Sequence, residues 1–391
     1  MDNITLILEG GALRSMYTAG VLDTFMRNNI EAQTIIGVSA GALSGLNYLS
    51  KQIGRTAKIN IDYCNDPNYI GTKALLKEKG LIGFNYLFEE ISKNDTPFDF
   101  ETFKNSKQEF ITVVANCETA ETEYISKSNA KDIFKVVQAS SSLPLCSKMV
   151  EIDGKHYIDG GITDSIPIEW AIEQGFKNIV VVLTRDRDYR KPGISKMMKN
   201  VYKRVYRQFP KTVDKLCTLP ERYNQTKELL NKLEDEGKIL VIRPQKEVTV
   251  SRLEKDKKKL ESLYQDGMND AEEKIDDIIR MIQRKGDDIT NLPFDEESLY
   301  EAVMAGEYDL TDDNDDSNNG EIEEEINDEN IEMVIDEEEK LSEEVLERED
   351  KEENKDKLEP VKDGYEILQE SVNKINNQKK RIKIKGIKNK K

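Results

Sequence analysis

The clearest chemical signal in this 391-residue sequence is GVSAG, residues 37–41, which fits the pattern G-x-S-x-G. In that pattern a strand ends at a nucleophilic serine and the chain turns sharply into a helix. Gly37, Ala40 and Gly41 are small enough to let such a turn form. The backbone dipoles at the start of the helix favour negative charge beside the serine. The pattern therefore indicates Ser39 as a candidate nucleophile for acyl transfer.

A serine nucleophile needs a base, which is usually a histidine, and His156 is the only histidine in the chain. It lies three residues before Asp159 on a predicted strand, so the two side chains point to opposite faces. Asp159 is followed by Gly160 and Gly161 and can present its carboxylate into a cleft, although the same motif is typical of an Asx turn. If Asp159 faces the cleft, His156 does not.

A glycine loop, EGGALR, follows the first predicted strand at residues 9–14. Gly10 and Gly11 let the backbone approach a ligand, and amide N–H groups there could form an oxyanion hole. A dinucleotide-binding loop would need glycines where Ala12 and Ser15 stand, and a suitably placed acidic residue is missing. Arg14 could orient the loop, attract an anionic substrate or pair with a helix C-terminus.

Strand-like and helical segments alternate in residues 1–183, which predicts an α/β fold with a central, mostly parallel sheet covered by helices. The strands are predicted at 5–8, 34–38, 110–115, 155–158 and 178–183. The helices are predicted at 17–27, 40–50, 131–139 and 167–174. Asp153 and Gly154 are predicted to form a hairpin turn before the fourth strand.

Residues 194–286 are mostly helical and charged, with one apolar run, ILVI at 239–242, that could join the sheet. Residues 264–283 carry an amphipathic helical pattern. We therefore predict one domain over 1–286, with a core at 4–185 and a helical extension at 194–286.

The rest of the chain differs in composition. Residues 287–391 hold 35 Asp and Glu against 15 Lys and Arg, so the acidity of the whole chain comes from this part. We predict a disordered acidic tail at 287–378. The basic residues 379–391 could fold back on that tail or form a patch for nucleic acid or anionic lipid.

The sequence also indicates where in the cell the protein is expected. Four widely spaced cysteines without a C-x-x-C pair suggest reduced thiols, and no signal peptide or apolar run of membrane-spanning length is evident, so we expect a cytoplasmic protein. The basic residues of 194–222 alternate with apolar ones. That pattern fits either a solvated face or peripheral contact with an anionic membrane.

The order of these motifs resembles the patatin-like phospholipase family, in its bacterial branch. The resemblance runs through EGGALRSMYTAGVLD at 9–23, GVSAGAL at 37–43, SSSLPL at 140–145 and DGG at 159–161. It implies a three-layer α/β/α fold and a Ser–Asp dyad with Ser39 as nucleophile and Asp159 as proton acceptor. It also implies an oxyanion loop of Gly10, Gly11, Ala12 and Arg14, and no metal or other cofactor.

The resemblance further implies a lipid acyl hydrolase of the phospholipase A or lysophospholipase type, acting in lipid breakdown, with no nucleic acid partner. Two residues depart from the family pattern: Ala12 replaces a glycine, and Ser15 replaces the glycine after the basic residue. An alternative is therefore a weakly active or inactive relative that binds lipid or protein. Residues 51–107 could cover the cleft, with pocket-lining or core aromatics at Tyr63, Tyr69, Phe84, Tyr86 and Phe88.

Overall fold

The computed structural model describes residues 2–283, and the predictions for the acidic and basic tail segments lie outside them. Within these residues the centre of the molecule is an eight-stranded sheet in the order β5-β6-β3-β2-β1-β7-β8, with β4 paired to β3. The strands are β1 (Asp2–Leu8), β2 (Ala32–Val38), β3 (Glu109–Asn116), β4 (Thr122–Ser126), β5 (Val150–Ile152), β6 (Lys155–Asp159), β7 (Ile179–Val182) and β8 (Leu240–Ile242).

The five strands β3-β2-β1-β7-β8 are parallel, and β4, β5 and β6 add antiparallel pairs at one side. The predicted strands are confirmed, and the run ILVI joins the sheet as β8 beside β7. The predicted hairpin turn is also present, with Asp153 and Gly154 at φ 50° and 80°. The sequence does not predict the strand β4, because TEYIS is short, largely polar and only half-buried.

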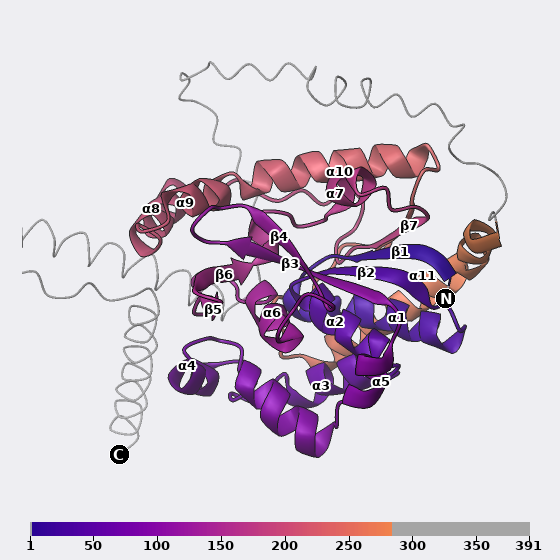
Figure 1. Cartoon of the computed structure of the whole chain (residues 1–391), viewed down its shortest axis with the longest axis horizontal. Coiled ribbons are helices and arrows are strands. Elements are labelled where there is room, and N and C mark those ends of the chain that lie inside the picture. Colours follow the sequence, from indigo (N-terminus) through magenta and orange to yellow (C-terminus); the bar gives the residue numbers. More distant parts are fainter. Residues whose placement is uncertain (1, 284–391) are drawn as a thin grey trace, which may run out of the picture.

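Helices cover both faces of the sheet (Figure 1). Successive β1 side chains enter different cores: Leu6 and Leu8 pack with α1 (Met16–Arg27), α2 (Ala40–Leu49) and α11 (Lys257–Gln283), whereas Ile7 packs with α7 (Ile168–Glu173) and α10 (Leu219–Asp235). This alternation is the period-two geometry of a strand buried on both sides. The predicted three-layer arrangement is confirmed.

The remaining helices flank these layers. Residues 51–107 form α3 (Arg55–Tyr63), α4 (Thr72–Glu78), the π-helix η2 (Tyr86–Asp95) and α5 (Phe100–Asn105). The others are α6 (Ile133–Ser140), α8 (Lys196–Val205), α9 (Pro210–Cys217) and the short 3-10 turns η1 (Ala12–Ser15) and η3 (Gly160–Ile162).

The longest helix, α11, crosses α1 with the two backbones in direct contact. A Cβ added to Gly267 would lie 2.1 Å from the carbonyl oxygen of Tyr17, and one added to Gly20 would lie 2.1 Å from that of Tyr264. Two hydrogen bonds flank the crossing, from Tyr17 to Asp270 (2.7 Å) and from Tyr264 to Asp23 (2.6 Å). The C-terminal helix is therefore fixed to the first helix of the chain.

We expect Gly267→Ala to lower the free energy of unfolding by about 3 kcal/mol, since the new methyl group must push one backbone away from the other. Chemical denaturation followed by circular dichroism measures the change. Gly193→Ala is the matched control, because nothing lies within 4 Å of a Cβ there. That variant should stay within about 0.5 kcal/mol of the parent protein. Equal stability of the two variants would contradict the close crossing.

Candidate active site

Ser39 occupies a strained turn between β2 and α2. Its backbone has φ 54° and ψ −126°, a conformation that L-residues rarely adopt, and it is the N-cap of α2. Its N–H group donates to the Ser140 hydroxyl at 2.8 Å, and its side chain is almost buried. Strain of this kind is concentrated at functional sites, and the strand–turn–helix context predicted for G-x-S-x-G is present.

Steric contact explains the glycines around this turn. A Cβ at Gly37 would lie 2.6 Å from Cα of Ala42, and one at Gly41 would lie 2.3 Å from the carbonyl oxygen of Leu8. A Cβ at Gly10 would lie 2.7 Å from Cβ of Ser39. None of the three has a φ in the left-handed region. Glycine is therefore needed at these positions because neighbouring atoms leave no room for a Cβ, and not because the backbone conformation excludes other residues.

Asp159 ends β6 and is buried, with 4% of its surface exposed. Its Oδ1 accepts the Gly161 N–H at 2.8 Å, and its own N–H donates to the Ser142 carbonyl at 2.9 Å. A Cβ at Gly160 would lie 2.2 Å from the carbonyl oxygen of Val113, so this turn also needs glycine. The Asx turn and the buried carboxylate are therefore both present, and they are compatible.

The Asp159 carboxylate and the Ser39 hydroxyl are neighbours. Burial raises the pKa of Asp159 from 3.8 to about 6, while the Ser39 hydroxyl, the Gly161 N–H and the charges of Lys191 and Arg252 lower it. Within the described residues Oδ2 of Asp159 has no partner that meets ordinary hydrogen-bond geometry. The contact with Ser39 is therefore longer or more bent than a full hydrogen bond, as is common for catalytic pairs without substrate.

The glycine loop lies beside Ser39, as the close approach of Gly10 requires. Ala12 has φ 48°, so the loop does need a left-handed residue where alanine replaces the family glycine. In residues 2–283 the N–H groups of Gly11 and Ala12 donate to no protein acceptor. The Nε of Arg14 donates to the Val250 carbonyl at 2.9 Å.

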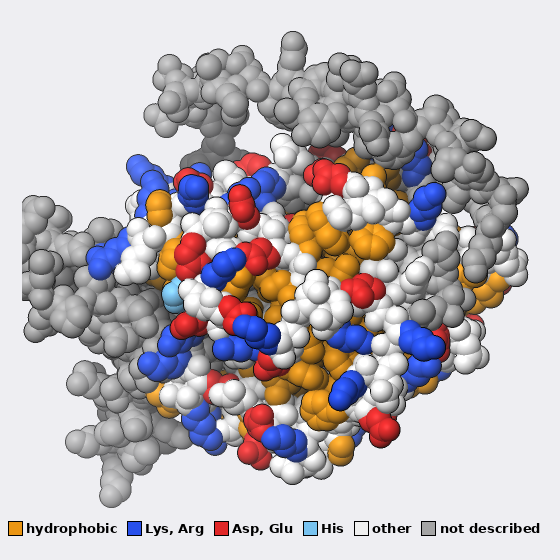
Figure 2. Space-filling view, viewed as in Figure 1, with side chains coloured by type: hydrophobic (Ala, Val, Ile, Leu, Met, Phe, Trp, Pro, Cys, Tyr) orange, Lys and Arg blue, Asp and Glu red, His pale blue; other side chains and the backbone are white. Residues whose placement is uncertain are grey.

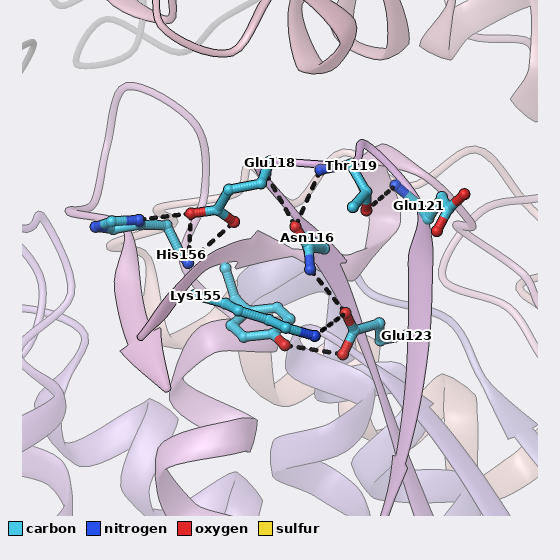
Figure 3. Close-up of polar contacts among 8 residues, drawn as sticks. Asn116, Glu118, Thr119, Glu121, Glu123, Lys155 and His156 are labelled. Atoms are coloured by element: carbon cyan, nitrogen blue, oxygen red, sulfur yellow. Dashed lines mark hydrogen bonds and ion pairs between the residues drawn. The ribbon is translucent and has the colours of Figure 1, made fainter. Parts of the chain in front are cut away.

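His156 contacts Glu118, which lies in the turn between β3 and β4 (Figure 3). Its Nδ1 lies 2.7 Å from Oε1 of Glu118, and 41% of its side-chain surface is exposed. The prediction from strand alternation is confirmed, since Asp159 is buried in the site and His156 faces outward.

A mostly apolar cavity of about 240 Å³ opens beside the cluster and includes Ser39 and Ala12 in its lining. Hydrophobic side chains gather in the middle of the face drawn in Figure 2. Residues 51–107 supply much of the cavity wall, as predicted for this segment. Of its five aromatic residues singled out from the sequence, Tyr69 and Phe88 line the cavity, and Tyr63, Phe84 and Tyr86 do not.

One cation lines the cavity in a buried position. Arg55 is 6% exposed and donates to Asn47 (2.6 Å), Ser92 (2.7 Å) and the Thr96 carbonyl (3.0 Å). It thereby connects α2, α3 and the end of η2. Among the described residues, no group of three or more His, Cys, Asp or Glu side chains could hold a metal ion.

Several residues around the site carried no recognisable signal. Glu9 is buried, and its two carboxylate oxygens accept hydrogen bonds from Tyr223 and Thr184. Lys191 is half-buried, with its ammonium 4.0 Å from the centre of the Tyr223 ring. The serine-rich turn at 140–145 is the exception, because it belongs to the motifs of the family resemblance. It accepts hydrogen bonds from the backbone N–H groups of both Ser39 and Asp159.

Parts of the chain are similar to known proteins. The family model of patatin-like phospholipases matches residues 6–172, and a domain of unknown function (DUF6363) matches residues 209–283. The chain is 31% identical over 188 residues to the uncharacterized protein YjjU of Escherichia coli (strain K12), over 46% of this chain and 52% of that protein. The chain thus spans about half the length of YjjU.

Two further relatives are more distant. Patatin-like phospholipase domain-containing protein 4 of Homo sapiens is 24% identical over 43% of this chain and 68% of its own length. The probable lipid hydrolase 463L of Invertebrate iridescent virus 6 is 25% identical over 43% of this chain and 63% of its own length. Among solved structures, VipD from Legionella pneumophila matches with a TM-score of 0.38 and 12% identity over 71% of this chain and 67% of its own.

No helix in the described part of the chain is long and apolar enough to cross a membrane.

We expect Ala12→Gly to raise the free energy of unfolding by about 1 kcal/mol, because glycine adopts φ 48° without the steric penalty of alanine. Thermal and urea unfolding measure this change. Ala120→Gly is the matched control, since Ala120 is a buried alanine at φ 59° in the β3–β4 turn. Both variants should be stabilised, and only Ala12→Gly should change any activity of the site. A destabilised Ala12→Gly variant would contradict the strain.

We expect Asp159→Asn to be more stable than the parent protein above pH 6. A carboxyl group with a folded pKa of about 6 and an unfolded pKa of 3.8 binds its proton more tightly in the folded state. The parent protein therefore loses up to about 3 kcal/mol as the pH rises from about 4 to about 6, and the asparagine variant does not. Unfolding experiments between pH 4 and pH 8 measure the difference.

Asp164→Asn is the control for a buried carboxyl group that does not contact Ser39. Burial also raises the pKa of Asp164 to about 6, but its carboxylate accepts the Tyr124 hydroxyl and not that of Ser39. The two variants should show the same trend in stability with pH. A stability gap for Asp159→Asn that stays constant across this pH range would contradict the raised pKa.

Proposed function

Residues 6–172 belong to the patatin-like phospholipase family, and from this premise we propose that the protein is a serine acyl hydrolase that cleaves lipid acyl esters. The observation that carries the proposal is the pairing of a strained Ser39 with a buried Asp159 carboxylate whose Oδ2 has no hydrogen-bond partner among the described residues. A hydroxyl and a carboxylate held together at the rim of an apolar cavity are suited to ester cleavage.

In the first step Ser39 Oγ attacks the ester carbonyl carbon while Asp159 accepts the hydroxyl proton. The alcohol part of the substrate leaves with that proton, and the acyl group stays on Ser39. Burial makes Asp159 a better base than an exposed aspartate, because its pKa of about 6 lies closer to neutral pH. Water then attacks the acyl group, gives a proton to Asp159 and releases the acid, after which Ser39 recovers its proton.

The oxyanion that forms in both steps needs donors. The N–H groups of Gly11 and Ala12 are candidates, because they have no protein acceptor in residues 2–283 and lie on the loop that touches Ser39. Alanine keeps its N–H group, so the replacement at residue 12 removes no donor. The strain at Ala12 favours a second candidate, a weakly active relative that binds lipid in the same cavity.

The cavity suits an acyl chain. Its lining is mostly apolar, with Leu43, Ile59, Tyr69 and Phe88 among the lining side chains. A lipid ester of the phospholipase A or lysophospholipase type is the substrate class that we propose. Peripheral contact of the basic segment 194–222 with an anionic membrane stays a prediction.

An active-site serine probe tests the proposal. We expect a fluorophosphonate to label the parent protein and not Ser39→Ala, and we expect the parent protein to hydrolyse a short-chain p-nitrophenyl ester. His156→Ala is the control: its labelling and turnover should stay within about twofold of the parent values. The proposed hydrolase activity is overturned if the parent protein is not labelled, or if Ser39→Ala is labelled to the same extent as the parent protein. Loss of turnover in a folded His156→Ala variant would instead favour a histidine-based mechanism.

A further inference from the structure

Three consecutive residues of α10 each contact a different part of the candidate site. They lie in residues 209–283, the region matched by a domain of unknown function. We propose that Arg222, Tyr223 and Asn224 are positioning residues: Arg222 holds the Asp159 turn, Tyr223 holds the glycine loop, and Asn224 holds the loop that carries Lys191. Region 209–283 is thereby an integral part of the site. The catalytic part of this inference rests on the proposed acyl hydrolase.

Tyr223 fixes the beginning of the glycine loop. Its hydroxyl donates to Oε1 of Glu9 at 2.7 Å, and both residues are buried, with 3% and 4% exposed. The other oxygen of Glu9 accepts the Thr184 N–H at 2.6 Å, and the Thr184 hydroxyl lies 3.0 Å from both that oxygen and the Gly10 carbonyl. Because a buried carboxylate is stable only with its donors in place, Glu9 is held at one position. Gly10 follows Glu9 directly.

Arg222 fixes the turn that begins at Asp159. Its two terminal nitrogens donate to the carbonyls of Thr163 (2.7 Å) and Ile162 (2.5 Å), at the end of η3. A third bond, to the Lys215 carbonyl at 2.8 Å, connects the same guanidinium to α9. Hydrogen bonds from a charged donor are among the stronger ones in proteins. The turn is thus held at one end by Arg222 and at the other by the Gly161 N–H bond to Asp159.

Asn224 fixes the loop that carries Lys191. Its side chain bonds to both backbone groups of that residue, with the Lys191 N–H at 2.8 Å and the carbonyl at 3.0 Å. The Lys191 ammonium then lies over the Tyr223 ring, and its positive charge lowers the pKa of Asp159. The third residue of the group therefore places a cation near the proposed base.

Helix geometry lets three neighbouring residues contact three separate segments of the site. Successive side chains on a helix are rotated by about 100°, so three in a row reach three directions. Here those directions lead to the end of β1, the turn after β6 and the loop after β7. A displacement of about 1 Å in a reacting group can lower the rate a hundredfold, so contacts of this kind matter for catalysis.

Hydrogen exchange measured by mass spectrometry tests the positioning directly on the full chain. We expect Tyr223→Phe to speed exchange at least tenfold in peptides covering residues 9–13 and to leave those covering 159–164 unchanged. Arg222→Gln should do the reverse. The matched control is Tyr264→Phe, which removes a similar hydroxyl–carboxylate bond, to Asp23, at the crossing of α1 and α11. Unchanged exchange at 9–13 in Tyr223→Phe, or the same increase there in Tyr264→Phe, overturns the inference.

Kinetics then separate positioning from stability. On a short-chain p-nitrophenyl ester, Tyr223→Phe should lower kcat about tenfold and leave KM within twofold of the parent value. Tyr264→Phe should leave kcat within twofold of the parent value, even where its Tm falls by as much as that of Tyr223→Phe. Equal losses of kcat in the two variants count against positioning. If the parent protein has no esterase activity, the proposed function fails, and the exchange experiment still decides whether α10 holds the two segments. Tyr223→Phe removes a single oxygen atom, so it keeps the test decisive if Arg222→Gln does not fold.

Discussion

The structure depends on how closely its backbone segments approach one another at the carboxyl ends of β1, β2 and β6. Gly10 lies against Ser39, Gly41 against the carbonyl of Leu8 and Gly160 against the carbonyl of Val113, at distances that leave no room for a Cβ. The contacts of Gly41 and Gly160 are with backbone carbonyls, and that of Gly10 is with Ser39 Cβ, whose position the backbone fixes, so no side chain can rotate aside to make space. The packing of the sheet ends therefore brings together Ser39, Asp159 and the glycine-loop N–H groups that have no acceptor within residues 2–283.

That packing supports a site that is unfavourable in itself. Ser39 and Ala12 have positive φ angles, and Asp159 is a buried carboxylate whose pKa is raised to about 6 by burial. Each feature lowers stability and each suits the proposed chemistry, a combination that is common at enzyme sites. The continuous apolar strands β1, β2 and β7, buried on both faces, supply the opposing stabilisation.

Local patterns made much of this predictable from the sequence. The strand–turn–helix around Ser39 and the outward position of His156 follow from the spacing of neighbouring residues, and the structure agrees with both. The sequence raised the question of a positive φ at Ala12 but could not answer it, since backbone conformation there depends on the packed loop. Tyr223 and Glu9 are separated by 214 residues, and neither belongs to a motif. Such a pair can be recognised only when the fold has brought the two together.

The crossing of α1 and α11 has a consequence for how the chain reaches its native state. The first helix, near the N-terminus, finds its backbone partner about 250 residues later, so on the ribosome it must wait for most of the described chain to be made. Until then the apolar surface around Gly20 has no cover, and closing so long a loop is slow. The contact between α1 and α11 can therefore form only late in synthesis.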